Sequence, residues 1–493
     1  MFERSVCPIG CLVVGLYLCA CFKTTPPATI EKNLNQNEIS RDSTSQPPGN
    51  PLGEQAGAWH NPCSEEIRLA NQTINNQALE STTIGVLLPL SGRYAAYGKA
   101  ALEGIKLGAG VFTEPGPGGR ELILEIRDTA GDPDQTVAQL EKLVTQQQVI
   151  AVIGPIFKAE TRAAAKKAEE LEVPLITLSG LPDIAQTGAY VFRNFITLEA
   201  QARSLVSYSM QKLGVEKFAV VYPANGFGLA FAEAFKAEVG RHKGEIPVFE
   251  SYPPDTKDFS KTVRQLIGLA RPEERPDYVA LKQKIYKKYK KATARKRALK
   301  RLARRLPPLI QFQAIFVADD YQRAAMIAPA LANANVFLHS DDKNEIKRYK
   351  KGLGRKKLKM VYLLGGEGWN HPELIRWAKR YVQGAVFCDG FFSDSSRDVT
   401  RLFVDQFRAN YDHDPDMIGA HAYDSARILK TIIEDKLPPS RLELRDQLLE
   451  LKGFMGVTGR ISFDENGDVE KELFLLTVKK KKIVELQKDL PAT

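Results

Sequence analysis

The sequence predicts an α/β protein made of two doubly wound, Rossmann-like lobes, and three observations lead to that fold class. From Thr83 onward, short apolar runs that read as strands alternate with longer stretches of helical pattern. Such alternation is typical of parallel sheets with helices on both faces. The strand-like runs number ten, which is more than one sheet of this kind usually holds. A chain of 493 residues is also long enough for two or three domains or lobes.

The individual elements are expected from apolar periodicity and from the turn residues between them. Strands are expected at 83–90, 121–127, 149–153, 173–177, 217–222, 245–250, 313–318, 335–339, 360–364 and 384–388. Helices are expected at 133–147, 158–171, 197–213, 227–240, 258–270, 372–381, 416–435 and 440–451. The chain then continues as a hairpin-like segment, ISFDENGDVEKELFLLTV. Its turn, DENGD, lacks the loop length and the closing Glu of an EF-hand, so we interpret it as a hairpin turn.

The stretch Ile84–Gly98, IGVLLPLSGRYAAYG, predicts a buried strand that ends in a turn and leads into a helix. Pro89 and Ser91-Gly92 break the strand before the Ala-rich helical pattern begins. In open α/β sheets, ligands bind at the carboxyl ends of the strands. We therefore expect one wall of a binding pocket between Ser91 and Tyr97, with an ordinary strand-to-helix turn as the alternative.

The first 20 residues read as a secretory signal peptide, because their apolar run is too short to span a bilayer. This run ends in Leu18-Cys19-Ala20-Cys21, which resembles a bacterial lipobox. Cys21 would then carry the lipid that holds the mature protein on a membrane. Phe22, rather than Asp, follows the cysteine and is compatible with export to the outer membrane. An uncleaved membrane anchor is the alternative.

Residues 21–82 are rich in Pro, Ser, Asn and Gln without apolar periodicity, and they predict a flexible tether. Beyond the signal peptide and the lipobox Cys21, the chain has two cysteines, Cys63 and Cys388. Export would allow a disulfide between them, whereas two separate buried thiols are equally compatible with the sequence.

The net charge of +10 comes from one segment, residues 281–306, which holds thirteen Lys or Arg and no acid. Subtracting these thirteen charges leaves about −3 for the rest of the chain. The segment's apolar residues fall mostly on one helical stripe, so we expect a long cationic amphipathic helix. It would attract an anionic envelope component such as lipid, cell-wall polymer or an acidic protein, whereas nucleic acid is not expected outside the cytoplasm. A solvated insertion without a partner is the alternative.

Catalytic motifs are missing from the sequence. It has no P-loop, GxSxG, HExxH or CxxC, and its six histidines are scattered. We therefore expect a protein that is not an enzyme and that holds no cofactor or metal.

Several motifs within residues 83–486 occur in the order of one protein family. They include IGVLLPLSG with Tyr97-Gly98, AVIGP at 151–155, VPLITLSG at 173–180 and GRISFDENGDV at 459–469. Together they resemble the leucine-binding-protein-like branch of the type I periplasmic binding proteins. A closer likeness, to lipoproteins known as penicillin-binding-protein activators, rests on FVADDYQRAAMIAPAL, GWNHPEL and GAVFCDGFFSDS.

The resemblance implies two lobes joined by a hinge of three chain crossings, with a ligand held in the cleft between them. Lobe one would comprise about 83–195 and 392–457. Lobe two would comprise about 196–391 and 458–486, with the basic helical insertion inside it.

Four ligand contacts carried over from the family are retained in type. They are aromatic residues that would contact the ligand and an acidic residue that would take its ammonium: Tyr97, Phe227, Tyr321 and Glu367. The carboxylate side departs from the family, because the turn at 156–161 offers Lys158 where hydroxyls are usual. Ser91 and Ser179 are the remaining expected donors. A zwitterionic ligand needs both its ends paired, so this departure puts ordinary amino-acid binding in doubt.

Two functions of different classes remain open. The first is a lipid-anchored periplasmic protein that binds a small polar, amino-acid-like solute and delivers it to an ABC permease. The second is a penicillin-binding-protein-activator-like regulator, which would act on a peptidoglycan synthase and have a reduced or empty pocket. The retained residues Tyr97, Tyr321 and Glu367 favour the first, whereas the departure at 156–161 and the outer-membrane signal favour the second.

Overall fold

The computed structural model describes residues 82–113, 121–340, 342–353, 359–436, 438 and 440–486. The predicted signal peptide, the lipidated Cys21, most of the tether and Cys63 lie outside these residues. Within the described part of the chain, no helix combines the length and the apolar character needed to cross a membrane.

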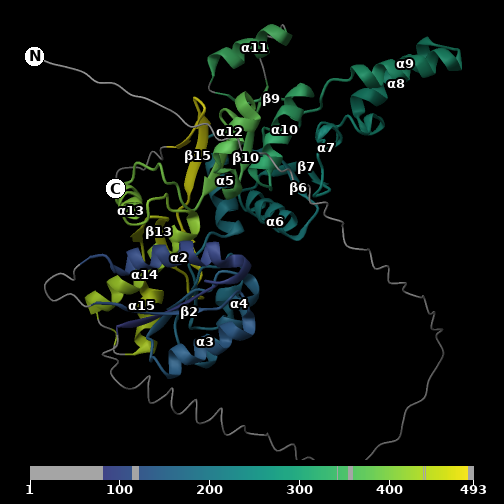
Figure 1. Ribbon diagram of the computed structural model, residues 1–493. Helices are drawn as coiled ribbons and strands as arrows, with labels where there is room; N and C mark the ends of the chain where they lie inside the picture. The colour runs from purple at the N-terminus through teal and green to yellow at the C-terminus, as the bar shows by residue number, and fades with distance from the viewer. Residues whose placement is uncertain are drawn as a thin grey trace, which may run out of the picture. The chain divides into compact units, whose positions relative to one another are not determined.

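The first sheet has five parallel strands in the order β2-β1-β3-β4-β5 (Figure 1). The first four coincide with runs expected from the sequence, whereas β5 was not expected. The strands are β1 (Thr83–Leu88), β2 (Ile123–Asp128), β3 (Ala151–Ile153), β4 (Leu175–Thr177) and β5 (Val191–Arg193).

The second sheet has eight strands, with seven in the order β16-β15-β11-β10-β8-β6-β7 and β9 paired to β10. The strands from β6 to β11 pair in parallel, and the antiparallel hairpin β15–β16 adds to the edge at β11. The strands are β6 (Lys217–Pro223), β7 (Glu245–Tyr252), β8 (Ala314–Val317), β9 (Phe337–Leu338), β10 (Met360–Gly365), β11 (Val386–Asp389), β15 (Phe474–Lys479) and β16 (Lys482–Glu485).

Helices cover both faces of each sheet, as the fold class requires (Figure 1). The first lobe contains η1 (Gly92–Tyr94), α2 (Ala95–Ala109), α3 (Pro133–Thr145), α4 (Lys158–Glu170), η2 (Ile184–Thr187), α13 (Asp398–Tyr411), α14 (Met417–Lys436) and α15 (Arg441–Glu450). The second lobe contains α5 (Leu198–Gln211), α6 (Gly226–Arg241), α7 (Ser260–Leu266), η3 (Pro272–Glu274), α8 (Pro276–Lys288), α9 (Ala292–Arg305), α10 (Tyr321–Asn333), α11 (Lys343–Leu353), η4 (Glu367–Trp369), α12 (Pro372–Ala378) and η5 (Lys379–Val382).

Side-chain caps fix where several helices begin. Asp132, Thr197, Asn225 and Asp320 each accept a hydrogen bond from a backbone N–H in the first turn of the helix that follows. These residue types satisfy N–H groups that a helix N-terminus leaves free. The caps place the first turns of α6 and α10 directly after the carboxyl ends of β6 and β8.

The core alternates along β1 between the two faces of the first sheet. Val86 and Leu88 pack with residues of α2, α14 and α15, whereas Leu87 packs with residues of α3 and α4. This period of two is expected for a strand that is buried on both sides. Gly98 lets α2 approach the turn after β1, because a Cβ there would lie 2.0 Å from the Pro89 carbonyl oxygen.

The chain passes between the two sheets three times: after β5, after β11 and before β15. The short strands β12 (Phe454–Gly456), β13 (Gly459–Phe463) and β14 (Val469–Lys471) form a separate antiparallel sheet. The turn between β13 and β14 is the hairpin turn expected from DENGD.

The predicted start of the last lobe-two segment, residue 458, differs from the structure. Ile461, Phe463 and Val469 of β13 and β14 belong to the core of the first lobe. Arg193 Nε donates to Asp468 Oδ1 at 2.7 Å, which ties the β13–β14 turn to β5. The chain therefore returns to the second lobe only near Leu473, just before β15.

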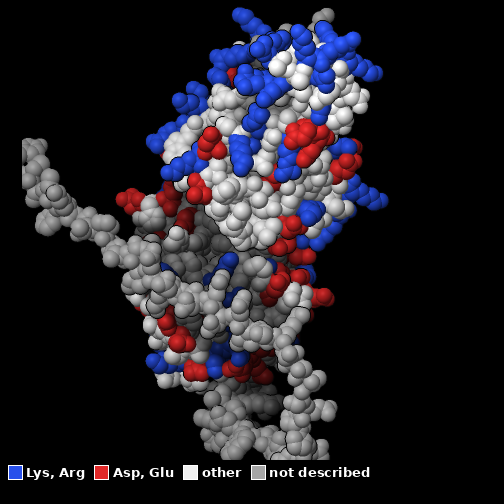
Figure 2. All heavy atoms as spheres, turned by 90° about the vertical axis from the view of Figure 1, so that its right-hand side faces the viewer, with Lys and Arg blue, Asp and Glu red and all other residues white. Residues whose placement is uncertain are grey.

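The basic segment 281–306 is a pair of helices rather than one long helix. The helical conformation is interrupted at residues 289–291, between α8 and α9. Arg295 stabilises the non-helical residues between α8 and α9, because its guanidinium donates to the carbonyl oxygens of Tyr289 (2.9 Å) and Lys290 (2.6 Å). Figure 2 shows Lys and Arg gathered over the end of the second lobe that carries α8, α9 and α11.

Candidate functional site

Acidic residues follow three neighbouring strands of the second sheet at their carboxyl ends. Asp319 lies two residues after β8, Glu367 lies two residues after β10, and Asp389 is the last residue of β11. Gly365 at the end of β10 pairs with Val317 of β8 and with Phe387 of β11. The parallel register therefore brings these carboxyl groups to one edge of the sheet, where ligands bind in folds of this class.

Glu367 reaches into the interior of the second lobe. Its backbone N–H donates to Gln201 Oε1 at 3.0 Å, which fixes the turn after β10 on helix α5. Its buried side-chain atom Oε2 has no hydrogen-bond partner among the described residues. Burial raises the pKa of Glu367 to about 8, and the nearby Asp389 carboxylate adds to the increase. The carboxyl is thus largely protonated at neutral pH unless a cation approaches it.

Asp389 is the second buried carboxyl of this edge. Its Oδ2 accepts from Asn370 Nδ2 at 2.8 Å, and its Oδ1 accepts from the Phe391 N–H at 3.3 Å. Burial nevertheless raises the pKa of Asp389 to about 7. Neither Glu367 nor Asp389 forms an ion pair within the described part of the chain. The two carboxyls therefore form an acidic pair for which the described residues supply no cation.

A pocket of about 850 Å³ opens beside this carboxyl pair. Asp389 and Asn370 line it together with Asp394, Asp414 and Asp416. Three basic residues, Arg376, Lys481 and Lys482, line its other side. Solvent and small solutes can thus reach the neighbourhood of Asp389.

Asp319 has a structural role at the same edge. Its Oδ2 accepts from Tyr252 OH at 2.6 Å, and its carbonyl oxygen accepts from Trp369 Nε1 at 2.8 Å. Burial raises the pKa of Asp319. The hydrogen bond from Tyr252 OH to Asp319 helps to raise the pKa of Tyr252. These two bonds join β7, β8 and η4 and so fix the turn that carries Glu367.

The predicted aromatic contacts of the second lobe lie in the first turns of two helices. Tyr321 starts α10 and stacks on His371, with ring centroids 4.1 Å apart and planes 4° from parallel. Phe227 lies in the first turn of α6 and is 50% exposed. Both helices follow the carboxyl ends of strands in the same sheet as Glu367. The structure therefore places Phe227, Tyr321 and Glu367 at one end of the second lobe.

The first lobe contributes a smaller aromatic group around Phe157. Tyr94 stacks on Phe157 with ring centroids 4.0 Å apart, and Tyr97 meets its edge at 5.5 Å. Tyr97 remains 48% exposed. Lys158, at the first position of α4, is also exposed. No hydrogen bond or ring contact between described residues joins this group to the predicted residues of the second lobe.

The two predicted serines take part in local turns. The Asp128 carboxylate accepts from the N–H groups of Leu90 (2.8 Å) and Ser91 (3.2 Å), which occupies the amides of the turn after β1. These hydrogen bonds lower the pKa of Asp128, although its partial burial opposes the change. The Ser179 hydroxyl is buried and accepts from the Leu181 N–H at 3.3 Å. The first lobe thus offers few free donors for a ligand carboxylate.

Asp389 and Gln201 are the members of this site that sequence reasoning missed. Asp389 directly follows the predicted strand 384–388, so the rule that ligands meet the carboxyl ends of strands could have identified it. Gln201 lies on α5, far from Glu367 in sequence, and carries no comparable signal. Its Oε1 is the acceptor for the Glu367 N–H.

A family model described as periplasmic binding protein matches residues 81–281 and 345–482. The unmatched stretch between them contains most of α8 and all of α9. Curated relatives include a Leu/Ile/Val-binding protein homolog of Brucella melitensis, 29% identical over 38% of this chain and 52% of the relative. The Leu/Ile/Val-binding protein of Escherichia coli is 26% identical over 39% of this chain and 53% of that protein. The chain thus spans about half the length of the curated relatives it matches.

Solved structures of the same fold cover most of the chain. One is a putative branched-chain amino acid ABC transporter from Rhodospirillum rubrum, 22% identical, with a TM-score of 0.64 over 82% of this chain and 100% of that structure. Another is the branched-chain amino acid substrate-binding protein of Streptococcus pneumoniae in complex with isoleucine. It is 22% identical, with a TM-score of 0.52 over 83% of this chain and 100% of that structure. Because the family model covers more than half of the sequence, this protein belongs to the periplasmic binding proteins, as a non-enzymatic, leucine-binding-protein-like member of type I.

Proposed function

We propose that the protein is a lipid-anchored periplasmic receptor that binds a small polar, amino-acid-like solute through the solute's ammonium group, as in ABC-type uptake. The observation that carries this proposal is the pair of carboxyls, Glu367 and Asp389, at the carboxyl ends of β10 and β11. Both pKa values are raised, and no ion pair to a Lys or Arg within the described residues compensates either group.

An ammonium group is the chemical complement of this pair. Two neighbouring buried carboxyls cannot both ionise without a counter-charge, so one of them holds a proton in the free protein. A bound ammonium supplies the positive charge, donates charge-assisted hydrogen bonds to the carboxylate oxygens, and displaces that proton. The free energy of solute binding is therefore coupled to deprotonation of Glu367 and Asp389.

The solute's other end is less constrained by the chain. The Ser179 hydroxyl and the amides of Leu90 and Ser91 already have partners, and Lys158 is exposed at the start of α4. Recognition of a carboxylate would rest on Lys158, whereas the aromatic side chains Tyr97 and Phe227 could cover an apolar group. We therefore expect amines and amino acids to bind better than acids without an amine.

The test is calorimetric titration of the full chain with L-leucine, L-isoleucine, glycine and a simple diamine at pH 6 and pH 8. The affinity of an ammonium ligand should rise by about tenfold or more between these values, because the raised pKa values of Glu367 and Asp389 lie between or near them. Glu367→Gln should weaken binding by about tenfold or more, since it removes a charge-assisted bond.

The matched control is Glu233→Gln on α6 of the same lobe, where an exposed ion pair to Lys236 at 3.0 Å is lost. This variant should bind as the wild type does. Binding that is independent of pH and unaffected by Glu367→Gln would overturn the ammonium assignment. A wild-type protein that binds none of the amines would overturn the receptor function itself.

The lipid anchor has its own test. Cys21 is the residue that the signal sequence marks for acylation. Cys21→Ser should release the protein from the membrane fraction, and mass spectrometry of the wild-type N-terminus should detect the acyl chains. Fractionation of the two membranes would distinguish the outer from the inner membrane.

A second candidate function is regulation of a peptidoglycan synthase, in the manner of penicillin-binding-protein activators. The basic surface of α8 and α9 favours it, because thirteen Lys or Arg in residues 281–306 offer a docking site for an anionic envelope component or an acidic partner. Replacing several of these lysines by Glu should then weaken that binding in a salt-dependent way. Under this function, Glu367→Gln would leave synthase activation unchanged.

A further inference from the structure

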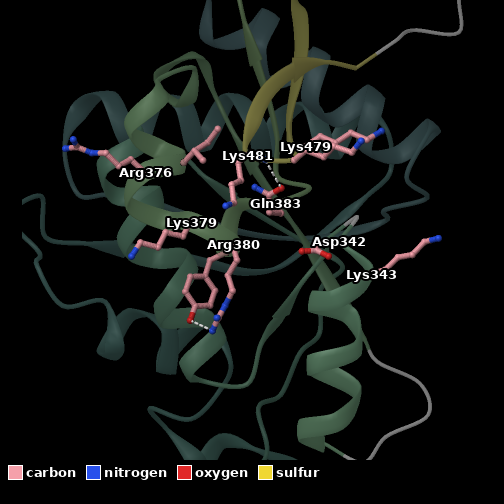
Figure 3. A pocket seen from close by; sticks show the side chains of 11 residues that line it. Asp342, Lys343, Arg376, Lys379, Arg380, Gln383, Lys479 and Lys481 are labelled. Atoms are coloured by element: carbon pink, nitrogen blue, oxygen red, sulfur yellow. Dashed lines mark hydrogen bonds between the residues drawn. The ribbon is translucent and has the colours of Figure 1, made fainter.

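A pocket of about 1220 Å³ lies at the other end of the second sheet from Glu367. It is bounded by the start of α11, by α12 with η5, and by the turn between β15 and β16 (Figure 3). Gln383 in its wall lies three residues before β11, so the pocket is at the amino end of the strand whose carboxyl end carries Asp389. Glu367 and Asp389 do not line it, and it adjoins the pocket beside Asp389, with which it shares Ile375, Arg376 and Lys481.

The lining of this pocket is strongly basic. Among the described residues that line it, one, Asp342, is acidic and seven carry a positive charge: Lys343, Arg376, Lys379, Arg380, Lys479, Lys480 and Lys481. Ile375 and Tyr381 add an apolar side to the same pocket. These residues come from three segments of the chain that the fold brings together.

The two arginines of the pocket already have acidic partners, whereas the lysines do not. Arg376 pairs with Glu373 at 2.7 Å, and Arg380 pairs with Glu345 at 3.3 Å. Arg380 also lies 4.8 Å from the centre of the Tyr381 ring. None of the five lysines forms an ion pair with a described residue. The charge that is free to meet a ligand is therefore held by the lysines.

Two of these lysines occupy a turn that normally selects other residues. Lys479 and Lys482 pair at the end of the β15–β16 hairpin, which leaves Lys480 and Lys481 as a two-residue loop. Their φ angles are 49° and 63°, values that define a turn in which Asn-Gly is strongly favoured. Lys379, at the end of α12, also has a positive φ of 52°. Lysine at all three positions is unfavourable for the backbone, which indicates that the side chains serve another purpose.

We propose that this pocket binds a polyphosphorylated anion, that is, a ligand carrying two or more phosphate groups. Phosphates carry more charge per group than carboxylates, and lysine binds them as a flexible point charge. In Figure 3, Lys481 extends toward Lys379 and Arg380, whereas Arg376 and Lys343 extend outward at opposite sides of the pocket. The pocket's volume exceeds that of one phosphate, and Tyr381 provides a face for a sugar or another apolar part of the ligand.

The first measurement is titration of the full chain with inositol hexakisphosphate and with pyrophosphate near physiological ionic strength, about 0.15 M. In a parallel arm, the chain is mixed with vesicles of phosphatidylcholine that do or do not contain a lipid with two phosphates. Binding of the soluble anions identifies a free ligand, and binding of the charged vesicles alone identifies a lipid headgroup. A wild-type chain that binds neither probe overturns the proposal.

The pocket variant is Lys379→Gln, Lys480→Gln and Lys481→Gln combined. Its affinity for the probe that the wild type binds should be lower by about tenfold or more, because three charge-assisted contacts are lost. It should also reduce the dependence of affinity on salt.

The matched control removes three exposed lysines outside both basic regions, with Lys166→Gln, Lys212→Gln and Lys261→Gln. It changes the net charge of the chain by the same amount. Its affinity should fall by less than about threefold, through long-range attraction alone. Equal weakening by both triple variants would show that only overall charge matters and would overturn the proposal.

A second variant separates binding from folding. Replacing Lys480→Asn and Lys481→Gly gives the turn its favoured residues, so the melting temperature should rise by roughly 2 °C. Binding of the same probe should nevertheless weaken by several-fold. A variant that is more stable and binds as well as the wild type would show that the turn lysines do not contact the ligand.

Discussion

Lys471 joins polar groups at the point where the chain crosses between the lobes, and its replacement by Met is the most informative stability test. Its Nζ donates to Asn194 Oδ1 (2.7 Å) and to Thr458 Oγ1 (2.7 Å), and it lies 2.9 Å from His421 Nδ1. Asn194 directly follows β5 and Lys471 ends β14, so two of the three crossings meet here. Asp424 accepts from the Thr458 hydroxyl at 2.6 Å and brings a negative charge to the group.

The magnitude follows from two opposing effects. A hydrogen bond from a charged donor stabilises the folded protein by roughly 1.5–3 kcal/mol, and three such bonds share one ammonium. Burial of the ammonium opposes them and lowers the pKa of Lys471 to about 7, although Asp424 partly offsets this effect. Lys471→Met should therefore lower the free energy of unfolding by about 2 kcal/mol at pH 7.

The effect should grow with pH. In the unfolded chain Lys471 keeps its proton up to a pKa of about 10.5, whereas in the folded protein it loses the proton near pH 7. Between these values the unfolded state binds more protons, so the stability of the wild type increases with pH. From pH 7 to pH 9 this amounts to about 2 kcal/mol, and Lys471→Met lacks it.

The assay is urea unfolding of the wild type, Lys471→Met and a surface control at pH 7 and pH 9. The control is Lys217→Met, which removes an exposed ion pair to Glu245 (2.7 Å) and should change stability by less than about 1 kcal/mol at both pH values. Comparing each variant with the wild type cancels the titration of all other groups. Equal destabilisation by Lys471→Met at pH 7 and pH 9 would refute the reasoning, because it would mean that Lys471 stays protonated in the folded protein.

Three further predictions concern the same parts of the fold. Glu367→Gln should match the wild type in stability at pH 5 and exceed it by about 2–4 kcal/mol at pH 9. The raised pKa of Glu367 stabilises the folded wild type at low pH, and this stabilisation is lost as pH rises through 8. Urea unfolding at the two pH values measures the difference. Asp128→Ala should cost about 1–3 kcal/mol, since three backbone N–H groups lose their acceptor; thermal unfolding checks it, and an unchanged melting temperature would contradict it. Gly390→Ala should destabilise the protein by about 1–3 kcal/mol, because the new Cβ would lie 2.9 Å from His421 Nε2 at the second crossing; an unaffected unfolding curve would show that the crossing shifts freely.

The framework of the fold could be predicted because its signals are local. The run Ile84–Leu88 reads as a buried strand from composition alone, and the turn residues at Pro89 and Ser91 mark its end. The turn's internal bonding could not be predicted in the same way. Asp128, which accepts hydrogen bonds from the amides of that turn, lies 37 and 38 positions away from them in the sequence. Its role therefore emerges only when β2 pairs with β1 in the folded sheet.

The basic segment shows where periodicity alone gives a wrong element. Its apolar stripe predicts one helix over 281–306, and no Gly or Pro interrupts the pattern. The break at 289–291 depends on Arg295, whose guanidinium binds the carbonyl oxygens that end α8. These hydrogen bonds join residues only five and six positions apart, but a contact between one side chain and a helix end has no periodic signal in the sequence.

Only part of the candidate site could be predicted, because one of its carboxyls lies in a local motif and the other joins it through strand pairing. Glu367 was found through a motif, and Asp389 was missed although it stands one residue beyond a predicted strand. The two carboxyls form a pair only because β10 and β11 lie side by side in parallel, with Gly365 opposite Phe387. Pairing of strands is a property of the folded sheet, and with it comes the raised pKa of both groups.

The two proposed sites of the second lobe lie toward opposite ends of one sheet, and their pockets meet at Ile375, Arg376 and Lys481. The carboxyl ends of β10 and β11 carry Glu367 and Asp389, whereas the amino end of β11 adjoins the pocket that contains Lys379. At physiological ionic strength, exposed charges more than about 8 Å apart are largely screened from each other. Lys379→Gln, which changes the basic pocket alone, should therefore leave solute binding unchanged, and Glu367→Gln should leave polyphosphate binding unchanged. If either variant altered both affinities, the sheet would have to transmit a conformational change, and the two sites would belong to one allosteric system.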